Sequence, residues 1–163
     1  MKSIKTIMLI LASISFITVI GGAIYEHVAA IPIWKLAPPV SLTMFQGEYG
    51  ITPFHFWKSI HPITMLLLVL ALVANWRTAR KNLILVTIIG YVIVLVITFT
   101  YFVPSLLDII EVPGNAVINE SLVSRAATWE ALSLVRLGCI VGLAIALLFS
   151  LTKGNETPET QVA

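Results

Sequence analysis

The chain alternates between four long apolar runs and shorter polar segments. Charged residues are absent from residues 6–25, 59–76, 82–107 and 137–152, and the last run extends back through Arg136 to about residue 131. A helix of about 20 apolar residues crosses the roughly 30 Å hydrocarbon layer of a membrane. Because that layer holds no water to bind the backbone, such runs must be helical. The pattern predicts an all-α integral membrane four-helix bundle with spans at about 6–25, 59–76, 82–107 and 131–152.

The first run has a second interpretation, as a signal peptide. Lys2 and Lys5 precede it, and the small residues 21–23 near its end resemble a cleavage site. The apolar stretch is long for a signal peptide, so we expect an uncleaved span. Residues 1–153 then form one transmembrane domain, and we expect the polar residues 154–163 to be a disordered tail.

The charges of the loops predict the orientation of the bundle. Positive charges occupy the N-terminal residues 1–5, the turn 77–81, which has no acidic residue, and Lys153 after the last span. The loop 108–130 carries four acidic residues and one arginine. By the positive-inside rule, both termini and the turn 77–81 face the cytoplasm, while the loops 26–58 and 108–130 face outward. We expect a multi-pass protein of a bacterial inner membrane.

Composition excludes several classes of protein. Hydrophobic residues make up 58% of the chain and charged residues only 11%, whereas a soluble domain carries about 25% charged residues. A net charge of +2 without a long basic cluster excludes a nucleic-acid partner. The single cysteine, Cys139, excludes a disulfide framework and a cysteine-rich metal site. The expected partner is therefore the lipid bilayer, with a homo-oligomer or a larger membrane complex as further options.

Polar residues gather where the four spans face outward. Residues that lipid would penalise are the first candidates for function in a membrane protein, and alternating topology brings these span ends to one level. The candidates at this level are Tyr25, Glu26, His27, His61, Tyr101, Arg125, Trp129, Glu130 and Arg136.

Several of these candidates also have a simpler structural interpretation. Tyr25, Tyr101 and Trp129 fit the aromatic belt at a membrane interface. Arg136 lies about one turn inside the fourth span, where a charge costs roughly 2.5–3.5 kcal/mol on insertion scales. Either a salt bridge to a carboxylate or an anionic ligand group would compensate that charge.

The first outward loop is long and rich in proline and aromatic residues. Its sequence Thr52-Pro53 predicts the start of the second helix, as a cap followed by proline. A loop of this composition is not a flexible linker, and it either packs over the mouth of the bundle as a lid or lies on the lipid surface. Its aromatic residues and those of the following helix start are Trp34, Phe45, Tyr49, Phe54, Phe56 and Trp57.

The outward residues suit acid–base chemistry on a lipophilic aromatic or quinone-like molecule. His61 and His27 are the expected proton acceptors, Glu26 or Glu130 orients them, and Arg136 holds an anionic oxygen. The expected substrate contacts are Arg136, Trp129, Tyr101, Tyr25 and Arg125. An oxidoreductase or oxygenase-like protein fits this pattern.

Non-enzymatic roles fit the same residues. His27 and His61 offer ligands for a metal or a heme, in a binding module or an accessory subunit. No pair on one helix has the spacing of a metal site, and adjacent Glu26 and His27 cannot both face inward from a regular helix, so we predict no metal site and no particular cofactor. Four spans are few for a secondary transporter. A small multidrug carrier usually has an acidic residue within its first span, whereas Glu26 falls only at the end of the first predicted span.

Short motifs give a family resemblance. Trp129, Ser133 and Arg136 are spaced four and three residues apart where the fourth helix begins. Residues 98–104 close the third span at a proline, and a glycine pair lies in the first span. This arrangement resembles the anthrone oxygenase-like family of four-span membrane proteins. The resemblance implies a four-helix bundle and cofactor-free oxidation of a polycyclic phenolic substrate, with Trp129 and Arg136 matching the family's conserved pair. The family often has asparagine where this chain has Ser133 and Leu106.

Overall fold

The computed structural model describes residues 2–112 and 117–154, and this part of the chain contains helices, turns and loops but no strand. Apart from residue 154, the predicted tail lies outside the described residues. The elements are α1 (Lys2–Tyr25), a π turn (Glu26–Ala30), α2 (Ile31–Trp34), a 3₁₀ helix (Val40–Phe45), α3 (Phe54–Ala74), α4 (Lys81–Ile97), a second π turn (Thr98–Phe102), α5 (Val103–Ile110) and α6 (Glu120–Leu151).

In residues 2–112 and 117–154, four helices are long and apolar enough to cross a membrane, which confirms the predicted number of spans. They cover Ile4–Trp34, Phe54–Ala74, Lys81–Ile110 and Glu120–Leu151. All four extend past the charge-free runs at one or both ends, because charged residues such as Glu26 and Lys58 do not break a helix. The second span, helix α3, begins directly after Pro53, although no side chain caps its first turn.

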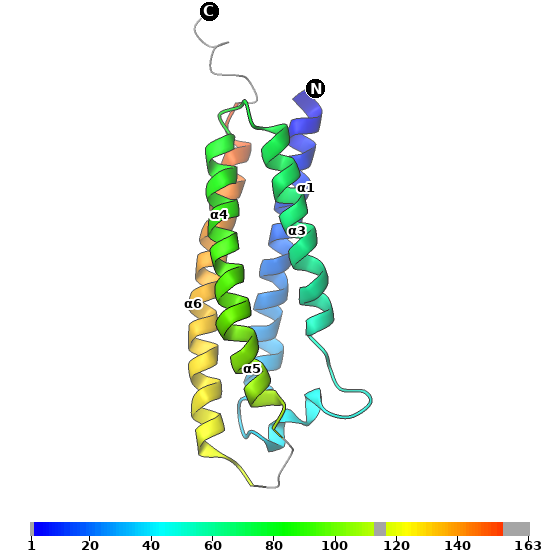
Figure 1. Cartoon of the computed structure of the whole chain (residues 1–163), viewed down its shortest axis with the longest axis vertical. Coiled ribbons are helices and arrows are strands. Elements are labelled where there is room, and N and C mark those ends of the chain that lie inside the picture. The colour runs from blue at the N-terminus through cyan, green and yellow to red at the C-terminus, as the bar shows by residue number, and fades with distance from the viewer. Residues whose placement is uncertain (1, 113–116, 155–163) are drawn as a thin grey trace, which may run out of the picture.

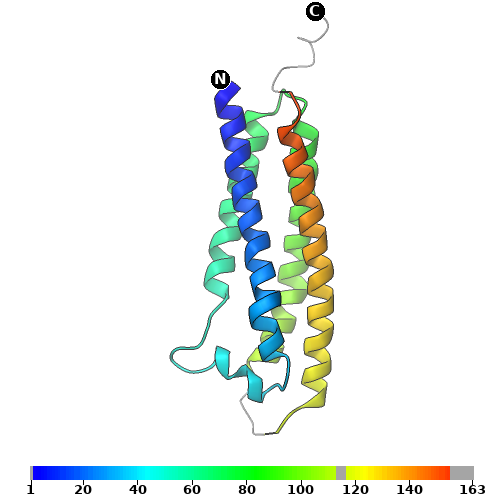
Figure 2. The ribbon, with the colours of Figure 1, turned by 180° about the vertical axis from the view of Figure 1, so that it is seen from behind.

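The four long helices form an antiparallel bundle (Figures 1 and 2). Helix α1 packs against α3 and α6, and α4 packs against the same two neighbours, so the order around the bundle is α1, α3, α4, α6. The start of α1, the end of α6 and the turn between α3 and α4 lie at one end, which we call the turn end (Figure 1). The two long connections lie at the opposite end, which we call the loop end.

The interior contains two clusters of buried apolar side chains. One fills the bundle from the turn end to its middle and includes Leu9, Phe16, Leu68, Ile84 and Leu147. The other lies at the loop end and comprises Ile31, Trp34, Leu42, Phe102, Ile109, Ala126 and Trp129. Burial of this apolar surface stabilises the packing between helices.

A buried arginine ties the turn end together. Arg80 is 5% exposed, and its guanidinium donates hydrogen bonds to the carbonyl oxygens of Lys153 (3.0 Å) and Leu151 (3.4 Å) and to Thr6 Oγ1 (3.1 Å). The last carbonyls of a helix lack partners within the helix and attract positive charge. Burial lowers the pKa of Arg80 from its ordinary value, but arginine stays charged in proteins. Arg80 therefore caps α6 and joins it to α1.

Candidate functional site

Two π turns lie towards the loop end, one between α1 and α2 and the other between α4 and α5. In the first, Ile31 N–H donates to the carbonyl of Glu26, and in the second, Val103 N–H donates to that of Thr98. Proline is the second residue after each turn, at positions 32 and 104. Because proline lacks an N–H and its ring crowds the carbonyl four residues earlier, a widened turn relieves the conflict. Such turns are frequent at functional sites.

The first π turn engages both Glu26 and His27 with neighbouring helices. Trp57 Nε1 on α3 donates to Glu26 Oε1 over 2.7 Å. His27 Nδ1 donates to the carbonyl of Ala23 (2.8 Å), and its Nε2 lies 2.7 Å from Ser133 Oγ on α6. The expectation that these adjacent residues cannot both face inward applies to a regular helix; here both contact neighbouring helices, because α1 has a packing partner on each side and the turn is a π turn.

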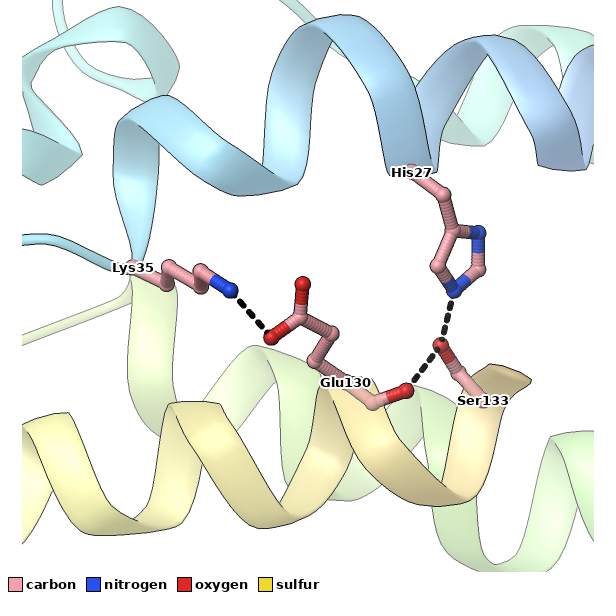
Figure 3. A network of polar contacts seen from close by, with 4 residues as sticks. All are labelled: His27, Lys35, Glu130 and Ser133. Carbon is pink, nitrogen blue, oxygen red and sulfur yellow. Dashed lines mark hydrogen bonds and ion pairs between the residues drawn. The ribbon is translucent and has the colours of Figure 1, made fainter. Parts of the chain in front are cut away.

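A second polar contact joins the same elements nearer the loop end (Figure 3). Lys35, which directly follows α2, forms an ion pair with the carboxylate of Glu130 on α6. The Ser133 hydroxyl also lies 3.1 Å from the backbone carbonyl of Glu130. The carboxylate of Glu130 thus binds Lys35, whereas the backbone carbonyl of Glu130 accepts from the Ser133 hydroxyl that contacts His27.

His61 belongs to a separate polar group deeper in the bundle. Its Nδ1 lies 2.7 Å from the hydroxyl of Tyr91 on α4, and Tyr91 is fully buried. The His61 ring stacks on Trp57, with ring centroids 5.2 Å apart and planes 21° apart. Trp57 therefore contacts His61 with its ring and Glu26 with its N–H, which links the two ionisable groups through one side chain.

Arg136 lies inside the fourth span and is bound by neutral groups. Its Nη1 donates to Thr98 Oγ1 over 3.3 Å, and its guanidinium carbon lies 4.1 Å from the centroid of the Phe102 ring. Within residues 2–112 and 117–154 it forms no ion pair with a carboxylate. Glu26 and His61 lie within its electrostatic range. From the sequence, either a salt bridge or an anionic ligand is the expected compensation for the Arg136 charge. The salt bridge is not formed in the described part of the chain.

Trp129 is a buried packing residue next to the second π turn. Its Nε1 donates to the carbonyl of Phe102 (2.9 Å), which ends that turn. Its ring also packs edge-on against Trp34 and Phe102, each with centroids 5.9 Å away. Trp129 thereby connects α6 to both proline-containing segments.

The remaining candidates lie at the surface of the bundle. Tyr25 is 69% exposed and Tyr101 is 41% exposed, which fits the aromatic belt. Arg125 Nη2 lies 3.5 Å from Asp108 Oδ2, and both side chains are exposed. The structure does not bring Arg125 or Tyr101 together with the two histidines.

A cavity of about 710 Å³ opens at the loop end beside the first π turn. Its wall is formed by α1, the first π turn, α2, residues 44–53 of the first loop, and single residues of α3, α5 and α6. Among the described residues that form this wall, Glu26 is the only charged side chain. The five rings in the wall belong to Tyr25, Trp34, Phe45, Phe56 and Trp129.

The cavity separates the sequence candidates into two groups. Glu26, Tyr25 and Trp129 line it, whereas the other six candidates do not. Sequence reasoning missed Phe45, Phe56 and Gly21 as wall residues. The glycine pair was the available signal, since Gly21 lets the cavity reach the backbone of α1, and a Cβ at Gly22 would lie 2.5 Å from the Phe56 ring.

The arrangement suits a lipophilic ligand more readily than a metal ion. In the part of the chain that is described, no three histidine, cysteine, aspartate or glutamate side chains are grouped so as to hold a metal. Both ring nitrogens of His27 are engaged in hydrogen bonds. An apolar cavity with a single carboxylate can bind a lipophilic molecule and exchange a proton with it.

Comparisons with known proteins give no match. No family model, no curated protein and no solved structure matches this chain. The resemblance to the anthrone oxygenase-like family therefore stays a prediction, and the function is inferred from the geometry of the site.

Proposed function

We propose that this protein binds a flat lipophilic aromatic or quinone-like molecule in the loop-end cavity and acts on it as an oxidoreductase or oxygenase-like protein. The observation that supports this proposal is the cavity itself, about 710 Å³ in volume, with apolar and aromatic walls and one carboxylate. Sites for drug-sized ligands typically have volumes of about 300–1,000 Å³ and apolar linings with few polar groups.

Glu26 is the group that would exchange a proton with the ligand. One of its carboxylate oxygens is bound by Trp57, and the carboxylate lies in the cavity wall. A hydroxyl of the ligand would donate to this carboxylate, as in general-base catalysis. His61 lies behind Trp57 as a second proton acceptor, and Arg136 lies outside the cavity wall.

The orientation in the membrane belongs to the same proposal. The positive charges of the turn 77–81 and of Lys153 lie at the turn end, so the positive-inside rule places this end, with both termini, in the cytoplasm of a bacterial cell. The cavity then opens at the outer side of the inner membrane. A reporter that is active only in the cytoplasm should be active when it is fused after Lys153. Activity of a periplasmic reporter at the same position would show that the orientation is the reverse of the one proposed.

Ligand binding is tested with menadione, a flat two-ring quinone, and protein purified in a neutral detergent. Trp34 and Trp129 line the cavity, so binding should quench tryptophan fluorescence. A Cβ at Gly21 meets no atom within 4 Å, so Gly21→Leu should fold and fill the cavity, with at least tenfold weaker binding. Gly138→Leu is the matched control, because Gly138 is equally open but lies on α6 outside the cavity. Absent quenching, or equal binding by both variants, would refute the site.

Turnover needs its own measurement. With reduced menadione as substrate, the protein should consume oxygen, and Glu26→Gln should abolish that consumption. Binding without oxygen consumption would reduce the proposal to a ligand-binding protein. An optical spectrum and elemental analysis of the same sample test the rival role, since a heme band or about one metal per chain would replace this proposal with a redox module.

A further inference from the structure

The wall of the loop-end cavity contains one carboxylate residue and, among the described wall residues, no cationic one. Five aromatic residues and Glu26 line it, and among the described wall residues none is a lysine, arginine or histidine. Two cations outside the wall have other partners: Lys35 is paired with Glu130, and Arg136 binds Thr98 and the Phe102 ring while its charge stays within electrostatic range of Glu26. Both the rings and the carboxylate therefore favour a positively charged occupant.

The chemistry of the rings supports the same conclusion. The face of an aromatic ring is negative, and it attracts a cation within about 6 Å of the ring centroid. This attraction is about 0.5–1 kcal/mol at exposed sites and about 2 kcal/mol or more where the cation is desolvated. Cages of aromatic side chains are the usual means of binding quaternary ammonium groups. An anion in the same cavity would be repelled by the rings and by Glu26.

The position of Glu26 within the span strengthens its contribution. The first span runs to Trp34, so Glu26 lies inside it and not at its end. Among the described residues its carboxylate has one hydrogen bond, from Trp57, and no ion pair. Charges interact more strongly where the surroundings are apolar than they do in water. A carboxylate in this position is a strong site for a cation that is itself lipophilic enough to leave water.

We propose that the loop-end cavity binds lipophilic monovalent cations, such as quaternary phosphonium or ammonium ions with aromatic groups, in preference to neutral molecules and anions of the same shape. The proposal rests on the proposed function only in using the same cavity, and it requires no reaction. The cation places its charge near Glu26 and its rings against Trp34, Phe56 and their neighbours.

Three probes of nearly equal shape and different charge test the proposal. Tetraphenylphosphonium is the cation, tetraphenylborate the anion and tetraphenylmethane the neutral molecule, each titrated into the protein in a neutral detergent by isothermal titration calorimetry. We expect tetraphenylphosphonium to bind at least tenfold more tightly than the neutral probe, and tetraphenylborate not to bind at the cavity. Equal affinity for the cation and the neutral probe would overturn the proposal.

Variants assign the charge preference to the site. Glu26→Gln keeps the shape of the side chain and should weaken tetraphenylphosphonium binding at least tenfold, whereas Glu48→Gln removes the same charge from an exposed loop position and should leave it unchanged. Phe56→Leu, which removes one ring, should weaken it several-fold. Equal effects of the two glutamate variants would also overturn the proposal.

Failure of this inference is distinguishable from failure of the proposed function. Menadione binding without a preference for the cation overturns the inference alone. Selective cation binding without menadione binding overturns the proposed ligand and supports the inference. If menadione and tetraphenylphosphonium compete with each other, and if Gly21→Leu weakens the binding of both, the two ligands share one cavity.

Discussion

His27 Nε2 lies 2.7 Å from Ser133 Oγ, and this contact joins α1 to α6 at the first π turn. Because His27 Nδ1 donates to the carbonyl of Ala23, a neutral ring can only accept at Nε2, and the one hydroxyl hydrogen of Ser133 is shared between this atom and the carbonyl of Glu130.

Ser133→Ala should lower the free energy of unfolding by about 0.5–2 kcal/mol, because it leaves the Nε2 atom of His27 without a donor. Unfolding in detergent, followed by circular dichroism, measures the change. Thr128→Ala is the control on the same helix, since this exposed threonine bonds only to its own helix. A loss in Ser133→Ala no larger than in the control would contradict the structural role of the contact.

Tyr91→Phe should destabilise the bundle by about 0.5–2 kcal/mol, because it removes the hydroxyl that binds His61 Nδ1 and leaves the ring in place. The edge contact with Phe16, at 4.9 Å between centroids, should persist. Histidine nitrogen chemical shifts should change for His61 and stay constant for His27. Tyr101→Phe, at an exposed position, should alter neither stability nor the spectrum, and an unchanged His61 signal in Tyr91→Phe would exclude the contact.

Gly22→Ala should weaken ligand binding several-fold while the protein stays folded. The new Cβ would lie 2.5 Å from Phe56 Cε1 and 2.8 Å from Cζ, so the Phe56 ring must move, and this ring lines the cavity. Titration with menadione or tetraphenylphosphonium measures the effect. Gly21→Ala adds the same methyl group in open space and should have a smaller effect; the reverse order would show that the cavity wall is arranged differently.

Arg80→Gln should cost about 1–3 kcal/mol of stability, because charged hydrogen bonds to the end of α6 and to Thr6 are lost. Arg77→Gln removes the same charge from an exposed position in the same turn and should cost little. Thermal unfolding in detergent distinguishes the two variants. Equal losses would mean that the charge of the turn matters and the buried contacts do not.

The sequence predicted the number of spans and the level at which polar residues gather, because both depend on local composition. It could not predict which helix faces meet. Phe16 is fully buried and Ile14 is 56% exposed, yet both are apolar, because lipid and protein interior favour the same side chains. The usual periodic pattern of apolar and polar residues therefore carries little information here.

The candidate site was predictable only in part. Glu26 and Trp129 stand out as residues that lipid would penalise or that suit an interface, and both line the cavity. Its other walls, such as Phe45 and Phe56, are ordinary apolar residues brought together by helix order and by a loop. The engagement of both Glu26 and His27 depends on the first π turn, for which Pro32 was the only local signal.

Each π turn also has an evolutionary consequence. Its hydrogen bond spans five residues instead of four, so the turn holds one residue more than the α-helix it interrupts. Deleting one residue there would restore a regular helix and rotate everything beyond it by about 100°. Trp34 would then leave the cavity wall. Distant homologues that have lost the turn should therefore show a one-residue gap at 26–30 or 98–102, together with a changed residue at the position of the following proline.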